Sequence, residues 1–156
     1  MEPLILLLLA WIDKHSTYDT TDMPIPAVVE MSARDLTKEV YKDTPERMPD
    51  NGIDENIFAF YSWEHSESGT IFIRPAADTK GPLFGDTPLD NPVFQERLLH
   101  ELIHHVQYFD GAYDRFPCHA IAEAEAYKLG GLFIQQENVA DPLPNRSALV
   151  HFYGLC

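Results

Sequence analysis

The chain has 156 residues, of which 45% are hydrophobic and 23% are charged, and these values are typical of a single folded domain over residues 1–156. Eleven Lys and Arg residues stand against 25 Asp and Glu residues, a formal net charge of −14, so the surface repels nucleic acid and anionic membranes. With only two cysteines, the chain is not a disulfide-dense scaffold and must fold around an apolar core.

The first predicted helix is the apolar run from Leu4 to Ile12. A membrane-spanning helix needs about 20 apolar residues, so this run is too short to span. Glu2 stands where a signal peptide carries positive charge, and Pro3 suits the first turn of a helix. We therefore expect a buried N-terminal helix, no membrane span and a cytoplasmic location.

A short strand, a short helix and a β-hairpin are predicted next. Residues 27–31 are typical of a strand, and Ser32 can cap a helix over residues 33–41. Residues 56–63 and 69–74 are rich in aromatic and β-branched side chains and flank a polar turn that contains Gly. That pattern predicts two antiparallel strands joined as a hairpin.

Two longer helices are predicted in the second half of the chain. Asn91 as N-cap and Pro92 at the first helical position indicate where one helix begins, and Gly111 indicates where it ends. After a loop of about six residues, Pro117 indicates the start of another helix, which runs through Leu129 or further. The last twenty residues show no repeat, low complexity or charged tail.

The helix that begins at Pro92 contains His100, Glu101 and His104 in the order H-E-x-x-H. Residues four apart lie on one helix face, so both imidazoles can bind one ion while Glu101 points toward the open side of that ion. The alternative is a chance match on a solvated helix face. Apolar neighbours around the motif favour the metal site, because they place it mid-helix: Leu98, Leu99, Leu102, Ile103 and Val106.

A catalytic zinc ion usually has three protein ligands and a water in the fourth position. Helical rise along both predicted helices brings Glu123 level with His104, provided that the loop folds the helices antiparallel. The same count brings Tyr127 beside His100. Glu125 lies about 200° around the helix from Glu123, so we expect it to be a solvated carboxylate. The sequence thus predicts Zn²⁺ ligands at His100, His104 and Glu123, with a merely solvated Glu123 as the alternative.

These motifs resemble those of a known group of enzymes. L-x-H-E-L-I-H-H-x-Q runs from Leu98 to Gln107, Cys118 follows, and E-x-x-A-Y begins at Glu123. With the N-terminal helix and the hairpin, this sequence is similar to the minimal gluzincin metallopeptidases, in particular a family of small bacterial zinc proteins. Many gluzincins carry Asp where this chain has Tyr127.

The resemblance implies both a fold and a function. The implied fold is α+β and zincin-like, with a small antiparallel or mixed sheet packed on the HExxH helix and on an antiparallel helix that carries Glu123, the third zinc ligand. The implied function is zinc-dependent peptide hydrolysis, with one strand lining the cleft and binding an extended peptide or protein substrate through its main chain.

The chemistry of the residues agrees with this expectation. Zinc lowers the pKa of its bound water to about 7, Glu101 accepts the proton, and the hydroxide attacks a carbonyl that the metal polarises. Glu101 then passes the proton to the leaving amine. The candidate donors to the oxyanion are Tyr127, His119 and His151.

A noncatalytic zinc-binding module remains the alternative, with the acidic surface or the hairpin edge as its contact face. Structural zinc sites usually have four protein ligands and favour cysteine, so an open fourth position distinguishes the two interpretations. The sequence leaves open the substrate, the oligomeric state and whether Cys118 and Cys156 pair. Two separate reduced thiols are at least as good an interpretation as one bridge.

Other residues near the motif have simpler interpretations. His105 points about 100° away from His104, so we expect a packed or surface histidine and not a fourth ligand. We expect Gln107 to face solvent, with a backbone hydrogen bond near the site as the alternative. Trp11 and Trp63 are expected in the core.

Overall fold

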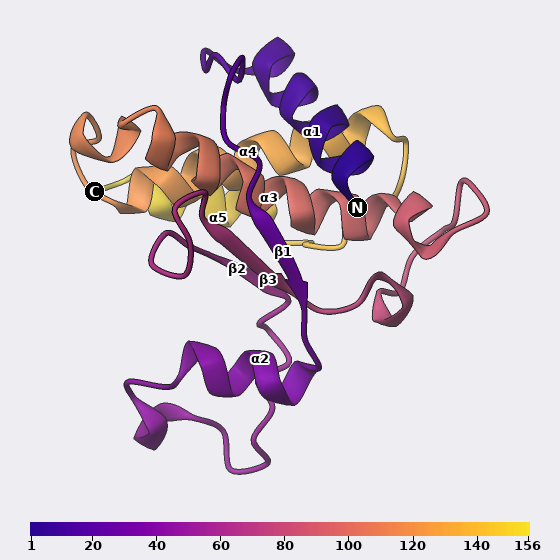
Figure 1. Cartoon of the computed structure of the whole chain (residues 1–156), viewed down its shortest axis with the longest axis vertical. Helices are drawn as coiled ribbons and strands as arrows, with labels where there is room; N and C mark the ends of the chain where they lie inside the picture. The colour runs from indigo at the N-terminus through magenta and orange to yellow at the C-terminus, as the bar shows by residue number, and fades with distance from the viewer.

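The computed structural model describes all 156 residues as five α-helices around one three-stranded sheet (Figure 1). The α+β class agrees with the expectation from the sequence. The helices are α1 (Glu2–His15), α2 (Ala33–Val40), α3 (Pro92–Phe109), α4 (Ala120–Gln136) and α5 (Arg146–Tyr153), and the strands are β1 (Ala27–Glu30), β2 (Ala59–Ser62) and β3 (Thr70–Ile73).

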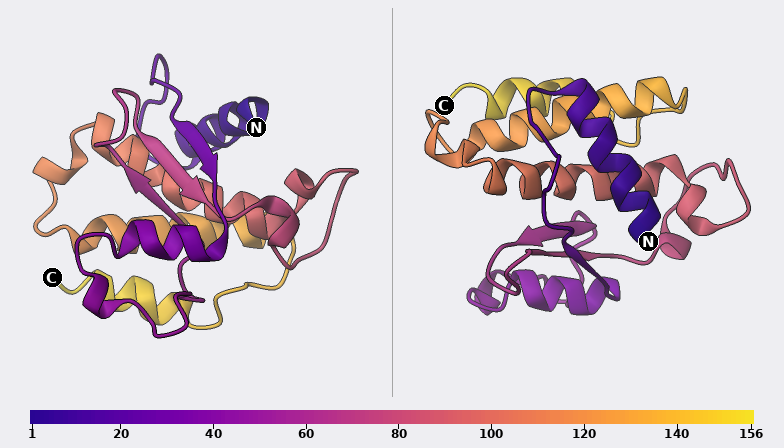
Figure 2. Two further views of the ribbon diagram at one scale, coloured as in Figure 1. Left: turned by 60° about the horizontal axis from the view of Figure 1, so that its bottom comes forward. Right: turned by 45° about the horizontal axis from the view of Figure 1, so that its top comes forward.

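The sheet is mixed, with the strand order β1-β3-β2. The predicted hairpin is confirmed as β2 antiparallel to β3, and β1 adds parallel to the other side of β3. Side chains of β3 alternate between the two faces, so Ile71 and Ile73 join the main core while Phe72 stacks on Phe60 on the opposite face. Helices α3 and α4 lie on the first side of the sheet and α2 lies on the second (Figure 2).

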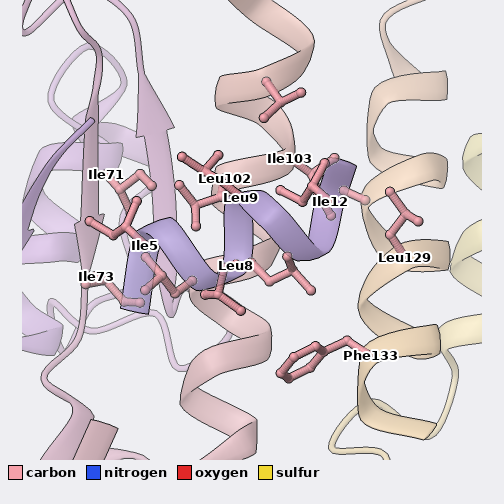
Figure 3. Close-up of a cluster of buried hydrophobic side chains, with 14 of the residues drawn as sticks. Ile5, Leu8, Leu9, Ile12, Ile71, Ile73, Leu102, Ile103, Leu129 and Phe133 are labelled. Carbon is pink, nitrogen blue, oxygen red and sulfur yellow. The ribbon is translucent and has the colours of Figure 1, made fainter. Parts of the chain in front are cut away.

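The main core forms where α1 crosses the other layers. Buried residues of α1 recur at helical spacing and pack with β3, α3 and α4 in one apolar cluster (Figure 3). The members from α1 are Ile5, Leu8, Leu9 and Ile12. The expected buried N-terminal helix is thus confirmed, and none of the helices has the length and apolar character that crossing a membrane requires.

Helix α3 begins and ends where the sequence indicates. The Asn91 side chain accepts a hydrogen bond from the Val93 N–H at 2.9 Å and donates one to the Thr79 carbonyl at 2.8 Å. Gly111 follows the helix with a positive φ of 66°, a conformation that favours glycine. The cap also anchors the long connection before α3, because Thr79 lies within it.

Helix α4 begins at Ala120, three residues later than Pro117 predicts. The first amides of the helix, at Ile121 and Ala122, donate to the carbonyls of Cys118 and His119 with the tighter i+3 spacing. Cys118 is itself held by a disulfide to Cys156 at a Cα–Cα distance of 5.9 Å. The alternative of two separate thiols is therefore wrong, and the end of the chain is tied to the start of α4.

Helix α5 has no counterpart among the predicted elements, and it is held in place by buried charge. The Arg146 guanidinium lies 2.7 Å from the Glu96 carboxylate, and these side chains are 6% and 4% exposed. A Cβ at Gly130 would lie 2.4 Å from Glu96 Oε1, and one at Gly131 would lie 2.7 Å from the Arg146 side chain. The two glycines, which weaken α4 intrinsically, thus make room for the ion pair that joins α3, α4 and α5.

We expect Arg146→Met to lower the free energy of unfolding by about 3–5 kcal/mol, because it leaves the Glu96 carboxylate buried without its partner. Urea denaturation followed by circular dichroism measures this loss. The double variant Arg146→Met with Glu96→Met should recover much of it, since both buried charges are then removed. Equal stability of the single variant and the wild-type protein would contradict this role for the pair.

Candidate metal centre

Three of the residues that the sequence singles out meet at one point between α3 and α4. The helices lie side by side and antiparallel, and the connection between them, residues 110–119, is longer than the predicted loop of about six residues and contains a 3-10 turn (Figure 2). His100 and His104 lie one turn apart on α3, and their Nε2 atoms are 3.2 Å apart. The Glu123 carboxylate on α4 lies 3.3 Å from Nε2 of His100 and 3.4 Å from Nε2 of His104. The structure thus brings together the three predicted ligands.

The spacing of these side chains allows them to share one metal ion. One ligand atom from each of the three residues lies within 4.8 Å of the others. The two imidazoles face different oxygens of the carboxylate, Oε2 for His100 and Oε1 for His104. Zinc binds histidine nitrogen and carboxylate oxygen at about 2.0–2.2 Å. No fourth His, Cys, Asp or Glu belongs to the group, so a fourth ligand of a bound ion would come from outside the group.

A hydrogen-bonded chain behind His104 fixes the orientation of its ring. His104 Nδ1 lies 2.9 Å from Gln107 Oε1, which can only accept, so Nδ1 carries a proton and Nε2 faces the site. Gln107 Nε2 donates to the Ala122 carbonyl and to Glu125, and the Tyr18 hydroxyl donates to the same Glu125 carboxylate. The expectations of a solvent-facing Gln107 and a solvated Glu125 are therefore wrong.

Glu101 lies beside the ligand group, as the motif predicts, and it lines the same cleft. Burial raises the pKa of its carboxyl group above the ordinary value of 4.5, while His100, His104 and the backbone N–H of Tyr61 partly oppose that rise. A raised pKa makes a carboxylate a stronger proton acceptor. Glu101 therefore has the position and the chemistry of a general base.

The three ligand residues perturb one another strongly. Burial lowers the pKa of His104, but the carboxylates of Glu123 and Glu101 outweigh this effect, so the net pKa is raised above 6.5. Burial raises the pKa of Glu123, but hydrogen bonds to His100 and His104 outweigh it and hold the pKa far below its usual range. Glu123 is therefore ionised at neutral pH, and the raised pKa of His104 favours a second proton, on Nε2, which an incoming cation must displace.

Two tyrosines flank the ligand group. The ring of Tyr127 packs edge-on against His100 at a centroid distance of 4.8 Å, and the Tyr113 hydroxyl lies 3.4 Å from Nδ1 of His104. Burial, together with the negative charge of Glu123, raises the pKa of each phenol to about 12. Both hydroxyls therefore keep their protons at neutral pH and can donate hydrogen bonds into the cleft.

The sequence names Tyr127 but misses Tyr113. Tyr113 lies in the turn between α3 and α4, where no motif or periodicity marks it, and only the packing of that turn brings it to His104. His119 lies against the Tyr113 ring at 5.7 Å, and His151 is exposed on α5. Because neither histidine lines the cleft, the structure does not support them as oxyanion donors.

The ligand group opens into a cleft of about 720 Å³. Its walls come from β2, α3, α4 and the segment that leads into α5. The Arg74 N–H donates to the Phe58 carbonyl, so these two residues form a hydrogen-bonded pair of the antiparallel ladder. Hydrogen-bonded and non-hydrogen-bonded pairs alternate along such a ladder, so the main-chain groups of Ala59 and Tyr61 point away from β3. Because Ala59 and Tyr61 also line the cleft, an unpaired strand edge borders the candidate metal centre.

The remaining expectations divide between packing and exposure. His105 is fully buried and its Nε2 donates to the Pro24 carbonyl at 2.7 Å, while burial lowers its pKa to about 4. It is a packed neutral histidine, as expected. Trp11 packs against the main core, but Trp63 is 51% exposed at the rim of the cleft, so its expected core position is wrong.

We expect Gln107→Leu to weaken zinc binding by about 10–100-fold, because His104 loses the acceptor that orients its ring. Competition with a chromophoric chelator measures the affinity, and circular dichroism checks the fold. Gln135→Leu is the matched control, since Gln135 is exposed on α4. An unchanged zinc affinity in folded Gln107→Leu protein would rule out the orienting role.

Zinc affinity should rise with pH in the region above 6.5, the ordinary histidine value, because the pKa of His104 is raised. The raised pKa of His104 means that its proton is still bound in this region and must leave when the metal binds. Glu123 adds nothing to this dependence, because its lowered pKa keeps it ionised throughout. Calorimetric titration in buffers of different ionisation enthalpy counts the released protons. An affinity that stays constant across this region would contradict the assignment.

No family model, curated protein or solved structure matches the chain. The resemblance to the minimal gluzincins therefore rests on the motifs around His100 and Glu123, together with the N-terminal helix, the hairpin and Cys118. What the site can do is inferred from the positions and chemistry of its own residues.

Proposed function

We propose that this protein is a zinc-dependent hydrolase that cleaves peptide bonds, with His100, His104 and Glu123 as metal ligands and Glu101 as general base. One observation carries the proposal, namely that two imidazole nitrogens and one carboxylate lie within 4.8 Å of one another on the wall of an open cleft. Three protein ligands leave a position for water, which is typical of catalytic zinc sites and not of structural ones.

The roles of the chain's own residues follow from their positions. A bound zinc ion supplies a Lewis acid that acidifies water and polarises a carbonyl group. Glu101 takes the proton of the attacking water and transfers it to the nitrogen of the leaving amine. Tyr127 and Tyr113 donate hydrogen bonds to the oxyanion that develops on the substrate carbonyl, since both hydroxyls stay protonated at neutral pH.

The residues of β2 along the edge of the cleft favour a peptide as the substrate. The outward main-chain groups of Ala59 and the outward carbonyl of Tyr61 on β2 offer an extended peptide a strand edge to pair with, while the Tyr61 N–H already bonds to Glu101. Phe58 and Phe60 add apolar surface along the same wall. A volume of about 720 Å³ is within the range of pockets that bind small molecules or short peptide segments. A sheet edge beside an HExxH helix is also the arrangement that a zincin-like fold implies.

The noncatalytic zinc module accounts for less of the site. It explains the ligand group but gives no role to a buried Glu101 beside it or to the cleft in front of it. The cytoplasmic location expected from the sequence remains a prediction. The Cys118–Cys156 disulfide weighs against that location, because disulfides persist mainly in oxidising compartments.

Glu101→Gln should retain zinc but lose peptide hydrolysis by about 10²–10⁴-fold, because the amide cannot accept the proton of water. Metal analysis measures zinc content, and mass spectrometry of a mixed peptide library measures cleavage. Glu67→Gln removes the same charge at an exposed position and should cleave as the wild-type protein does. A Glu101→Gln variant that loses its zinc, or that cleaves at the wild-type rate, would contradict the role of general base.

A further inference from the structure

Arg97 lies on α3 one turn before His100, and its side chain lines the same cleft. The guanidinium carbon lies 3.6 Å from the centre of the Phe58 ring, so the planar group is stacked on the wall next to β2. Arg74 lies over the same ring at 4.9 Å but does not line the cleft. Arg97 is therefore a positioned cation on α3, the helix that also carries the candidate ligands His100 and His104.

The charge of Arg97 has no partner in the protein. Its one hydrogen bond runs from Nη1 to the Thr79 hydroxyl at 3.4 Å, and it forms no ion pair. Neighbouring arginines differ in this respect, since Arg74 pairs with Glu55 and Arg146 with Glu96. A guanidinium carries five N–H donors in a fork that matches a carboxylate, so most of the donors of Arg97 are available to a ligand.

The other charged residues of the cleft have direct partners when a metal is bound. Glu96 pairs with Arg146, which also pairs with Asp141 outside the cleft, and the divalent cation of the proposed function compensates Glu101 and Glu123. Arg97 is then the one charged side chain on the cleft wall without a direct partner. A half-buried cation without a partner is costly, and an anionic group on the substrate supplies the missing partner.

We propose that Arg97 determines specificity by binding a carboxylate of the substrate. This inference rests on the proposed peptide hydrolysis and names its substrate class, namely peptides with an acidic side chain or a free terminal carboxylate near the scissile bond. One helical turn advances about 5.4 Å and an extended peptide advances about 3.3 Å per residue. The carboxylate therefore belongs about one or two residues from the bond that is cleaved.

Binding of defined peptides to the Glu101→Gln protein tests the inference without turnover. The probes are matched peptides with Glu or Gln at each position next to the expected bond, each with a free or an amidated C-terminus. Fluorescence of Trp63, which is exposed at the cleft rim, reports binding with and without zinc. The measured quantity is the ratio of the dissociation constants of neutral and anionic peptides.

Adding Arg97→Gln should lower this ratio by about 10–100-fold in both metal states, the loss expected for hydrogen bonds to a charged group. Arg97→Lys should keep part of the preference, because the charge remains while the fork is lost. Arg115→Gln is the control, since Arg115 is exposed outside the cleft and the change in net charge is identical. It should leave the ratio unchanged.

Each outcome decides the matter. Dependence on Glu against Gln identifies an acidic side chain, and dependence on amidation identifies a terminal carboxylate; either supports the anion site. The anion site is overturned if the ratio of dissociation constants is the same before and after Arg97→Gln, or if no peptide binds. If the protein cleaves neutral and anionic peptides equally in a zinc-dependent way, the role of Arg97 is wrong and the proposed hydrolysis stands. If the protein binds anionic peptides selectively but shows no zinc-dependent cleavage, the proposed hydrolysis is wrong and the anion site stands.

Discussion

The antiparallel packing of α3 against α4 is the constraint on which the candidate site depends, because it alone brings a carboxylate of one helix to two imidazoles of the other. Several contacts fix this register. The apolar side chains of α1 pack across both helices, and Gln107 of α3 donates to the Ala122 carbonyl of α4. At the other end of the helix pair, Arg146 pairs with Glu96 of α3 and packs against Gly130 and Gly131 of α4. A slip of one residue would rotate Glu123 by about 100° and remove it from the site.

The buried charged residues differ in whether they have a partner of opposite charge within the protein. Where buried charge stabilises the fold, it is paired within the protein, as in the Glu96–Arg146 ion pair. Two charged side chains of the cleft, Glu101 and Arg97, form no ion pair within the protein. Uncompensated groups with perturbed pKa values in one cleft are typical of binding and catalytic sites. These unpaired charges lower the stability of the protein, and a bound cation and an anionic ligand would neutralise them.

Local sequence signals predicted the parts of the site that depend on helix geometry. Caps and spacing located α3 closely, and the count of helical rise identified Glu123 as the residue opposite His104. The same signals failed where contacts distant in sequence decide the outcome. Gln107 and Glu125 appear solvated in a helical projection, yet they are linked through a chain that reaches Tyr18. The disulfide stayed undecided and α5 was missed for the same reason, since the residues that contact each other lie far apart along the chain.

A crystal structure of the zinc-loaded protein, with anomalous diffraction recorded at the zinc absorption edge, tests the central claim most directly. The account predicts one anomalous peak about 2.0–2.2 Å from Nε2 of His100, Nε2 of His104 and a carboxylate oxygen of Glu123, with a solvent oxygen in the fourth position. The absence of a peak there would contradict the account. So would a peak that Glu123 does not bind, or one at which a fourth side chain closes the coordination.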